Sequence, residues 1–381
     1  MFSFDRENTG LVAKWWRNID KQILFLFAFL LLLGLFFSFS STSPIAGEKM
    51  NKETYFFFIK HLFFVFISLF LLITISIQEK NKLTKFLLFL FFISIVLLFL
   101  TLVVGVEVKG SKRWMGVDPF LRFQPVELVK PLFIIFVAKV IALNEKVNLY
   151  KRYLFSFLVL LLIIIILINQ PDLGQTLLLA SVWITMVFVS GFDMVILLIL
   201  GLAFLSIITL LIFFSPEKFG YVFLRIKTFM DPKAGDNFQS QKALDAIKQG
   251  GLTGQGMGEG ILKDEVPEAH TDYIIAVVSE EFGAIFVLFI VTIFLFIGYK
   301  VFNKVFSEKN EFLKLALVGL VSLLIIQTFI HIGVNTRLLP TTGMTLPFLS
   351  YGGSSLIGSS IIAGVVLNFT RKDSTRYSEN D

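Results

Sequence analysis

The sequence predicts an all-α membrane protein that crosses the bilayer about ten times. Of its 381 residues, 56% are hydrophobic, the mean hydropathy is +0.81 and 46 residues are phenylalanine. This composition is too apolar for a soluble domain. The apolar residues gather in runs of the length that a helix needs to cross a bilayer. The absence of cysteine excludes disulfides, cysteine-ligated zinc and thiol chemistry, and three histidines argue against a multi-histidine metal site.

Ten apolar runs supply the predicted spans. They cover residues 23–41, 55–77, 83–105, 126–144, 153–169, 173–190, 193–214, 271–298, 311–335 and 346–369. Only Gln170-Pro171-Asp172 separates the fifth span from the sixth, and the sixth meets the seventh at Gly191-Phe192, so we expect tight turns at both places. No cleavage site of small residues follows the first run, which we therefore interpret as a signal anchor.

Lysine and arginine are distributed unequally between the segments that connect the spans. With the N-terminus inside, the short inner segments carry 17 of these residues and the short outer loops carry 7. Because positive residues favour the cytoplasmic side, both termini are predicted to be cytoplasmic and the long loop 215–270 extracytoplasmic. We expect a cytoplasmic segment over 1–22, one transmembrane domain over 23–369 and a cytoplasmic tail over 370–381.

The stretch 266–273 closes the long loop and opens the eighth predicted span. Within it, Asp272 places a carboxylate at the mouth of a membrane helix, where a charge is costly and is by default a functional candidate. A face of small residues is expected to follow it: Ala276, Ser279 and Gly283. Glu280 and Glu281 are predicted to point elsewhere, where they would pair with other helices or lie near the cytoplasmic side.

One charged cluster precedes the fourth span, and a second lies at the start of that span. Lys112 and Arg113 adjoin Trp114, and the guanidinium of Arg113 offers a planar fork that suits a phosphate. The same composition also fits an anchor for lipid headgroups. Glu127 and Lys130 lie three residues apart near the start of the fourth span and can pair on one helix face. Intramembrane charges usually face a bundle interior, which favours a pair that lines a polar cavity over a purely structural pair.

Further polar residues follow along the chain. Asp172 and Gln175 have the spacing of a helix capping box, which favours a structural role. In the long loop, Arg225, Gln239 and Lys242 precede a glycine run at 250–260 that lacks the Gly-Lys-Ser/Thr ending of a P-loop and is typical of tight turns. Residues 333–355 hold two prolines, several hydroxyls and a Gly pair, which favours either a binding site at a broken helix end or a helix-packing seam.

These residues together suggest group transfer from a lipid-linked diphosphate, because nucleotide-activated donors are cytoplasmic and the candidate site is outside. Asp272 would deprotonate an acceptor hydroxyl, while the cations would stabilise the departing diphosphate. A divalent cation, Mg²⁺ or Mn²⁺, is expected to assist, although the sequence identifies no dedicated protein site for it. The residues alone do not distinguish such a transferase from a transporter.

Five separated motifs resemble the SEDS family (shape, elongation, division and sporulation) in the family's order, and the match covers residues 20–372. They are Lys112-Arg113-Trp114, Phe123-Gln124-Pro125-Val126-Glu127, Pro171-Asp172-Leu173-Gly174-Gln175, Pro267-Glu268-Ala269-His270-Thr271-Asp272 and Ser350-Tyr351-Gly352-Gly353-Ser354-Ser355. The resemblance implies a ten-helix bacterial peptidoglycan glycosyltransferase of the cytoplasmic membrane that polymerises lipid II. It also implies a class B penicillin-binding protein as transpeptidase partner, with other division-complex membrane proteins and no nucleic acid.

The stretch 333–347 is more similar to the cell-division member of the family than to the elongation member, which implies a place at the division septum. His331 stands where the family often has Asn, and Arg337 where it often has Gly. These two departures leave the predicted fold unchanged but bear on the detail of the outer mouth.

The resemblance also implies roles for single residues. The catalytic acid of the family falls on Asp272, with Glu127 and Lys130 as the polar pair beside it and Lys112, Arg113 and Trp114 near the substrate. Other expected substrate contacts are Arg225, Gln239, Lys242, Glu268, His270, Ser350 and Ser354. The implied reaction is an inverting attack of the acceptor GlcNAc 4-hydroxyl on C1 of the donor MurNAc, with undecaprenyl diphosphate leaving, and it needs one base.

Two other functions stay open from the sequence. Ten helices with charges at Glu127 and Lys130 would also suit a lipid II flippase. Short tails and many helix surfaces would suit a non-catalytic scaffold of the division complex.

Overall fold

The computed structural model describes residues 10–42, 53, 55–108, 111–116, 122–143, 147–214, 216–231 and 237–372. Residues 1–9 and 373–381 of the two predicted cytoplasmic segments lie outside this part. In chain order the elements are α1 (Leu11–Asn18), α2 (Lys21–Phe37), the π-helix η1 (Ser38–Thr42), α4 (Phe56–Ile77), α5 (Lys80–Val104), β1 (Val106–Val108), β2 (Ser111–Trp114), α6 (Pro125–Ile141), α7 (Leu149–Asn169), α8 (Leu173–Val189), α9 (Met194–Phe214), α10 (Pro216–Met230), α11 (Phe238–Gly250), the 3₁₀-helix η2 (Leu262–Glu265), α12 (Ile274–Ser307), α13 (Glu311–Asn335) and α14 (Gly353–Thr370).

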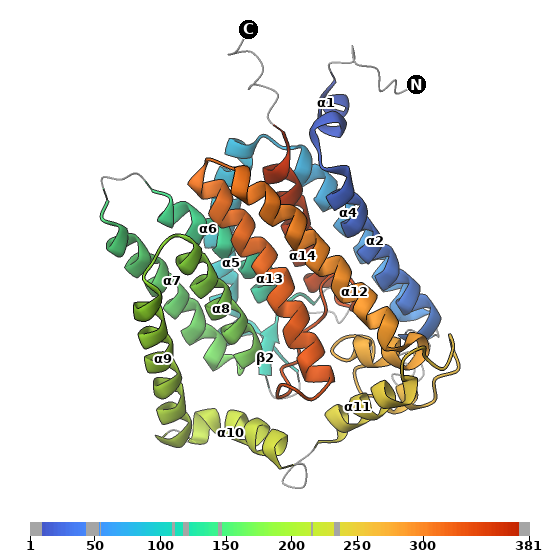
Figure 1. The fold of residues 1–381 in the computed structure, drawn as a ribbon. Coiled ribbons are helices and arrows are strands. Elements are labelled where there is room, and N and C mark those ends of the chain that lie inside the picture. The colour runs from blue at the N-terminus through green and yellow to red at the C-terminus, as the bar shows by residue number, and fades with distance from the viewer. Residues whose placement is uncertain are drawn as a thin grey trace.

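The predicted all-α membrane fold is confirmed, and each of the ten apolar runs contains a helix (Figure 1). In the described part of the chain, seven helices are long and apolar enough to cross a membrane: α2 with η1, α4, α5, α7, α12, α13 and α14. The helices α6 and α8 are each 17 residues long, and α6 carries three charged side chains. The chain is a multi-pass membrane protein.

Burial separates the central helices from the outer ones. In α14 and α13, 89% and 72% of the apolar window is buried, and nearly every residue of α6 is buried. The outer helices α4 and α5 instead expose large aromatic side chains: Phe63, Phe66, Phe70, Phe86, Phe89 and Phe92. Lipid solvates such side chains without penalty, while the polar groups of α6 are enclosed by protein.

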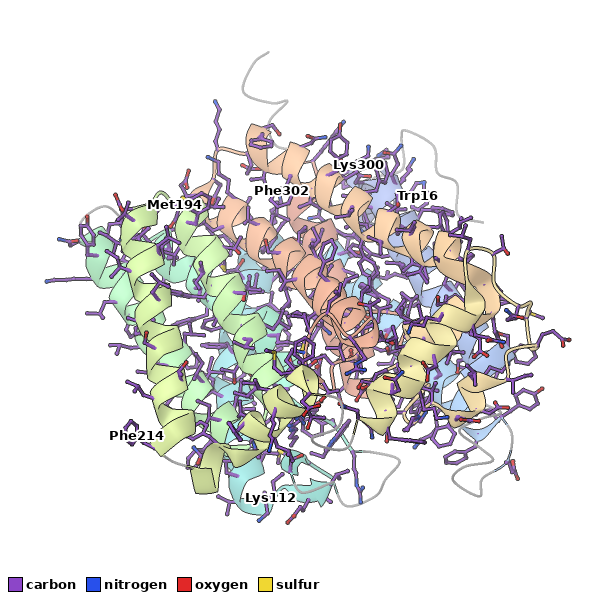
Figure 2. The ribbon with its side chains drawn as sticks, turned by 60° about the horizontal axis from the view of Figure 1, so that its bottom comes forward. Trp16, Lys112, Met194, Phe214, Lys300 and Phe302 are labelled. Carbon is purple, nitrogen blue, oxygen red and sulfur yellow. The ribbon has the colours of Figure 1, made fainter. Side chains whose placement is uncertain are left out.

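The two described ends of the chain meet at one end of the bundle, opposite α10 and α11 (Figure 1). The backbone N–H of Lys372 donates to the carbonyl of Asn18 at 3.1 Å. The guanidinium of Arg371 donates to the carbonyls of Ser76 and Ile77 at the end of α4. Figure 2 shows Trp16 and Lys300 toward this end and Lys112 at the other.

The sequence did not predict the structured parts of the connections. The strands β1 and β2 pair antiparallel, and α10 and α11 occupy much of the loop 215–270. The helix α12 begins at Ile274 rather than 271 and is broken at Gly283, whose φ is 82°. The amides that follow the break, those of Ala284 and Ile285, donate to the carbonyls of Gly251 and Leu252. The glycine run therefore allows a close approach to α12.

Glu280 and Glu281 lie where that loop meets α12, which corrects the expectation that they point toward other helices or the cytoplasmic side. The carboxylate of Glu280 accepts from the N–H of Leu262 at 2.8 Å, and that of Glu281 accepts from the N–H of Gly258 and from the ammonium of Lys263. The loop folds back onto the start of α12, a long-range contact that helical periodicity does not indicate.

Candidate active site

A cavity of about 630 Å³ lies at the end of the bundle that carries β2 and α10. Its walls come from the β-hairpin, the turn before α8, α10, the turn before α12 and the segment between α13 and α14. Seven of the predicted site residues line it: Arg113, Trp114, Arg225, Gln239, Glu268, Asp272 and Ser354. The fold thus brings together candidates that the sequence separates by more than 200 positions.

Asp272 lies in the turn that precedes α12, and not within the helix as expected. Its backbone N–H donates to the carbonyl of Glu268 at 3.1 Å, and its own carbonyl accepts from Asn335 Nδ2 at 3.0 Å. Asn335 Oδ1 also accepts from the N–H of Ala276 at 3.3 Å. The end of α13 therefore fixes the backbone of Asp272, while the N-terminus of α12 favours a negative charge there.

Two neighbours of the Asp272 carboxylate were not predicted as site residues. A Cβ added at Gly343 would lie 3.4 Å from Asp272 Oδ2, so the segment after α13 passes close beside the carboxylate. Tyr273 also lines the cavity, and burial, reinforced by the charge of Asp272, raises the pKa of its hydroxyl. The Tyr273 hydroxyl therefore stays protonated and able to donate.

Arg113 and Trp114 form the wall that β2 contributes. Arg113 Nε donates to the carbonyl of Gln170 at 3.1 Å, and its terminal nitrogen donates to the carbonyl of Pro171. Arg113 Nε also lies 3.6 Å from Asp172 Oδ2. These contacts engage Nε and one terminal nitrogen and so hold the guanidinium in one orientation.

The turn before α8 confirms the structural role predicted for Asp172. Asp172 Oδ1 accepts from the N–H of Gln175 at 3.3 Å, as an N-cap does. The side chain of Gln175 does not complete a capping box, because it donates to Glu127 Oε1 at 3.1 Å. The turn is thereby connected to α6.

Glu127 and Lys130 form a buried pair. The prediction that they line the cavity is wrong, because neither residue is part of its lining. Lys130 Nζ lies 2.9 Å from Glu127 Oε1 and 3.0 Å from Gln327 Oε1. Gln327 Nε2 in turn donates to the carbonyl of Thr345, a residue that does line the cavity, at 2.8 Å. The pair therefore supports the cavity wall through Gln327.

The remaining predicted contacts lie outside the cavity lining. Lys112 is exposed on the β-hairpin, and Lys242 pairs with Glu265. The imidazole of His270 is buried, with its ring centre 5.3 Å from that of Phe57 and 5.6 Å from that of Tyr351.

Ser350 and Ser354 have different surroundings. Ser350 Oγ donates to the carbonyl of Thr271 at 2.6 Å and accepts from the N–H of Leu346. It therefore ties the turn before α12 to the segment before α14. Ser354 lines the cavity, and its Oγ accepts from the N–H of Gln124 at 2.8 Å, just before α6 begins. Only Ser354 of the two is placed to meet a ligand in the cavity.

The structure offers limited means of holding a metal ion. Among the residues that it describes, no group of three or more His, Cys, Asp or Glu side chains is arranged as a metal site. The cavity nevertheless holds two carboxylates, those of Glu268 and Asp272. Mg²⁺ is often bound by one or two carboxylates together with substrate phosphates, so these residues fit a cation that the substrate helps to hold.

Comparisons with known proteins agree with this architecture. Residues 21–375 match the model of the FtsW/RodA/SpoVE family, described as cell cycle proteins. The chain is similar to proteins named probable peptidoglycan glycosyltransferase FtsW. The relative from Caulobacter vibrioides is 32% identical over 98% of this chain and 95% of its own length. The relative from Francisella salina is 35% identical over 92% and 88%.

Solved structures share the fold. A chain from a peptidoglycan synthase complex that coordinates polymerization and crosslinking aligns with a TM-score of 0.75 and 25% identity, over 95% of this chain and 99% of that one. The rod shape determining protein RodA of Thermus thermophilus aligns with a TM-score of 0.67 and 24% identity, over 96% and 99%. Because the family model matches nearly the whole of this chain, the chain belongs to the FtsW/RodA/SpoVE family of cell cycle proteins.

Proposed function

We propose that this chain, a peptidoglycan glycosyltransferase, polymerises lipid II into β-1,4-linked glycan strands with the Asp272 carboxylate as base. One observation carries the proposal: Asp272 shares a single cavity with Arg113 and Arg225. A carboxylate that can accept a proton thus lies beside cations that can stabilise a leaving diphosphate. The names of the relatives support the same activity.

In the proposed step, the oxygen of the acceptor GlcNAc 4-hydroxyl attacks C1 of the donor MurNAc. The new C1–O bond forms as the bond from C1 to the diphosphate oxygen breaks, and the diphosphate leaves with that electron pair. The hydroxyl proton passes to Asp272. Attack from the face opposite the leaving group converts an α-linked donor into a β-linkage, for which one base suffices.

Glu268 is assigned a different role from Asp272. Its Oε2 accepts from the hydroxyl of Thr271 at 3.1 Å, and its carbonyl accepts from the N–H of Asp272. Glu268 thereby shapes the turn that presents Asp272. Glu268, with Asp272 nearby, would hold a divalent cation, which would supply further positive charge for the leaving group.

The placement of the chain in the cell is part of the proposal. Both termini would be cytoplasmic, so the cavity would open on the outer side of the cytoplasmic membrane, and the protein would act at the division septum. A class B penicillin-binding protein would crosslink the strands. Support for such a partner comes from the synthase complex that shares this fold and coordinates polymerization with crosslinking.

The test uses the purified full-length chain, alone and with its cognate class B penicillin-binding protein. Lipid II is supplied with Mg²⁺ or Mn²⁺, and glycan strands are resolved on a gel and digested with a muramidase that cleaves β-1,4 links. Muramidase-sensitive strands are expected. If neither preparation makes strands while vesicles that hold the chain move lipid II across the bilayer, the protein is a flippase and the proposal fails.

A further inference from the structure

A second cavity adjoins the first. It has a volume of about 250 Å³ and lies between α10, the start of α11 and the segment that follows α13. Arg225, Gln239 and Thr341 line both cavities, so the two share a wall. Neither Asp272 nor Arg113 lines the second cavity. A ligand in this side pocket would therefore be a part of the substrate away from the reacting carbon.

The chemistry of the side pocket suits an anion. Two guanidinium groups line it, those of Arg225 and Arg337, together with the amide and hydroxyl side chains of Asn237, Gln239 and Ser240. None of the lining residues that the structure describes carries a carboxylate. A terminal nitrogen of Arg337 donates to Gln241 Oε1 at 2.6 Å. Because this amide oxygen carries no net charge, the contact does not neutralise the guanidinium. Guanidinium groups bind carboxylates through paired hydrogen bonds.

The backbone of Arg337 gives a second, independent observation. Arg337 follows the C-cap residue Thr336 of α13 and has a φ of 56°. This left-handed position after a helix is usually occupied by glycine, because a side chain there is strained. Strain that persists at a non-glycine residue is a reason to look for a function of its side chain.

We propose that the side pocket binds a carboxylate of the peptide that the glycan substrate carries, with Arg337 as its main contact. The inference rests on the proposed function, because it assumes that lipid II or the growing strand occupies the adjoining cavity. The diphosphate is the other anion of this substrate, but it must reach the reacting carbon beside Asp272. The peptide carboxylates are the anions that can extend past Arg225 into the side pocket.

The test compares two substrates and three proteins. The substrates are lipid II with free carboxylates on its peptide and lipid II in which these carboxylates are converted to amides. The proteins are the full-length wild type, Arg337→Gly and Lys227→Ala, each assayed with the penicillin-binding protein. Arg337→Gly removes the guanidinium and places the favoured residue at the left-handed position. Lys227→Ala removes an exposed cation of α10 that lines neither cavity.

In Arg337→Gly, the KM for the carboxylate substrate should rise about tenfold, because one charge-assisted hydrogen-bonded contact is lost. The KM for the amide substrate should change less than about twofold. Lys227→Ala should alter neither value, and the melting temperature of Arg337→Gly should not fall. An equal loss on both substrates would overturn the inference and leave the proposed function intact. Strands from neither substrate with the wild type would overturn the proposed function, and this inference with it.

Discussion

Asn335 connects the two helix ends that meet beside Asp272. Its side chain donates to the carbonyls of Asp272 and His331 and accepts from the N–H of Ala276. It is fully buried, so no water can replace these bonds, and each buried polar group left unpaired costs about 1–3 kcal/mol. Asn335 is thus a positioning residue that acts through the backbone of Asp272.

We expect Asn335→Ala to lower both stability and kcat, because the turn that presents Asp272 loses its anchor. Thr328→Val is the matched control: Thr328 is equally buried in α13, but its hydroxyl donates only to the carbonyl of Leu324 in its own helix. The measurements are the melting temperature and the polymerisation rate. If the two variants lose kcat in proportion to their loss of stability, Asn335 has no positioning role.

At the scale of single residues, the sequence predicted those site members whose type alone suggests chemistry. Asp272 is a carboxylate at the start of an apolar run, Arg113 and Arg225 are cations of predicted outer loops, and all three line the cavity. It could not predict Tyr273 or Gly343, whose place beside the carboxylate depends on the path of the chain after α13. Glu127 and Lys130 were expected on the cavity surface, because nothing in their own segment indicates that they are buried and bonded to Gln175 and Gln327.

At the scale of elements, a buried ion pair between Lys263 and Glu281 holds the end of the loop 215–270 against α12. Glu281 and Lys263 are almost fully buried, whereas Lys242 and Glu265 form a partly exposed pair in the same loop. Removing one partner of a buried pair typically costs about 3–5 kcal/mol, because a charge is left without compensation. An exposed pair contributes about 0–1 kcal/mol.

Glu281→Gln should therefore release the loop, and Glu265→Gln should not. The measurement is hydrogen exchange over residues 250–265, with the melting temperature recorded alongside. We expect faster exchange throughout this range in Glu281→Gln and exchange close to that of the wild type in Glu265→Gln. Equal protection in the two variants would contradict the anchoring role of the buried pair.

The elements that the sequence predicted well are those constrained by the bilayer. A run of about 20 apolar residues has few alternatives to a helix in the bilayer, and every such run contains a helix, seven of them long and apolar enough to span in the described part of the chain. The helices α10 and α11 lie in polar, mixed sequence that no such length requirement marks. The start of α14 was placed seven residues too early because Leu346 to Leu349 are apolar, yet Phe348 has a φ of 65° and the segment forms a turn.

At the scale of the whole molecule, both described chain ends lie at one end of the bundle (Figure 1). The elements β2 and α10, which contribute to the cavity lining, lie toward the other end. The distribution of positive residues assigns the first end to the cytoplasm. The absence of cysteine from the sequence allows this orientation to be tested with single introduced cysteines.

Lys112→Cys on the β-hairpin and Lys309→Cys between α12 and α13 are both exposed and lie at opposite ends. A maleimide that does not cross membranes should label the first variant in intact spheroplasts, and the second only after permeabilisation. The parent chain should not be labelled under either condition. The reverse pattern would place the cavity in the cytoplasm, away from a lipid II donor on the outer leaflet.

The central claim is that the Asp272 carboxylate is the base of a glycan polymerase, and the most direct measurement is strand formation from lipid II by Asp272→Asn. The matched control is Asp264→Asn, which neutralises an exposed carboxylate of the same loop. We predict strands from the wild type and Asp264→Asn, and none from Asp272→Asn at an unchanged melting temperature. Strands of wild-type length and rate from Asp272→Asn would contradict the account.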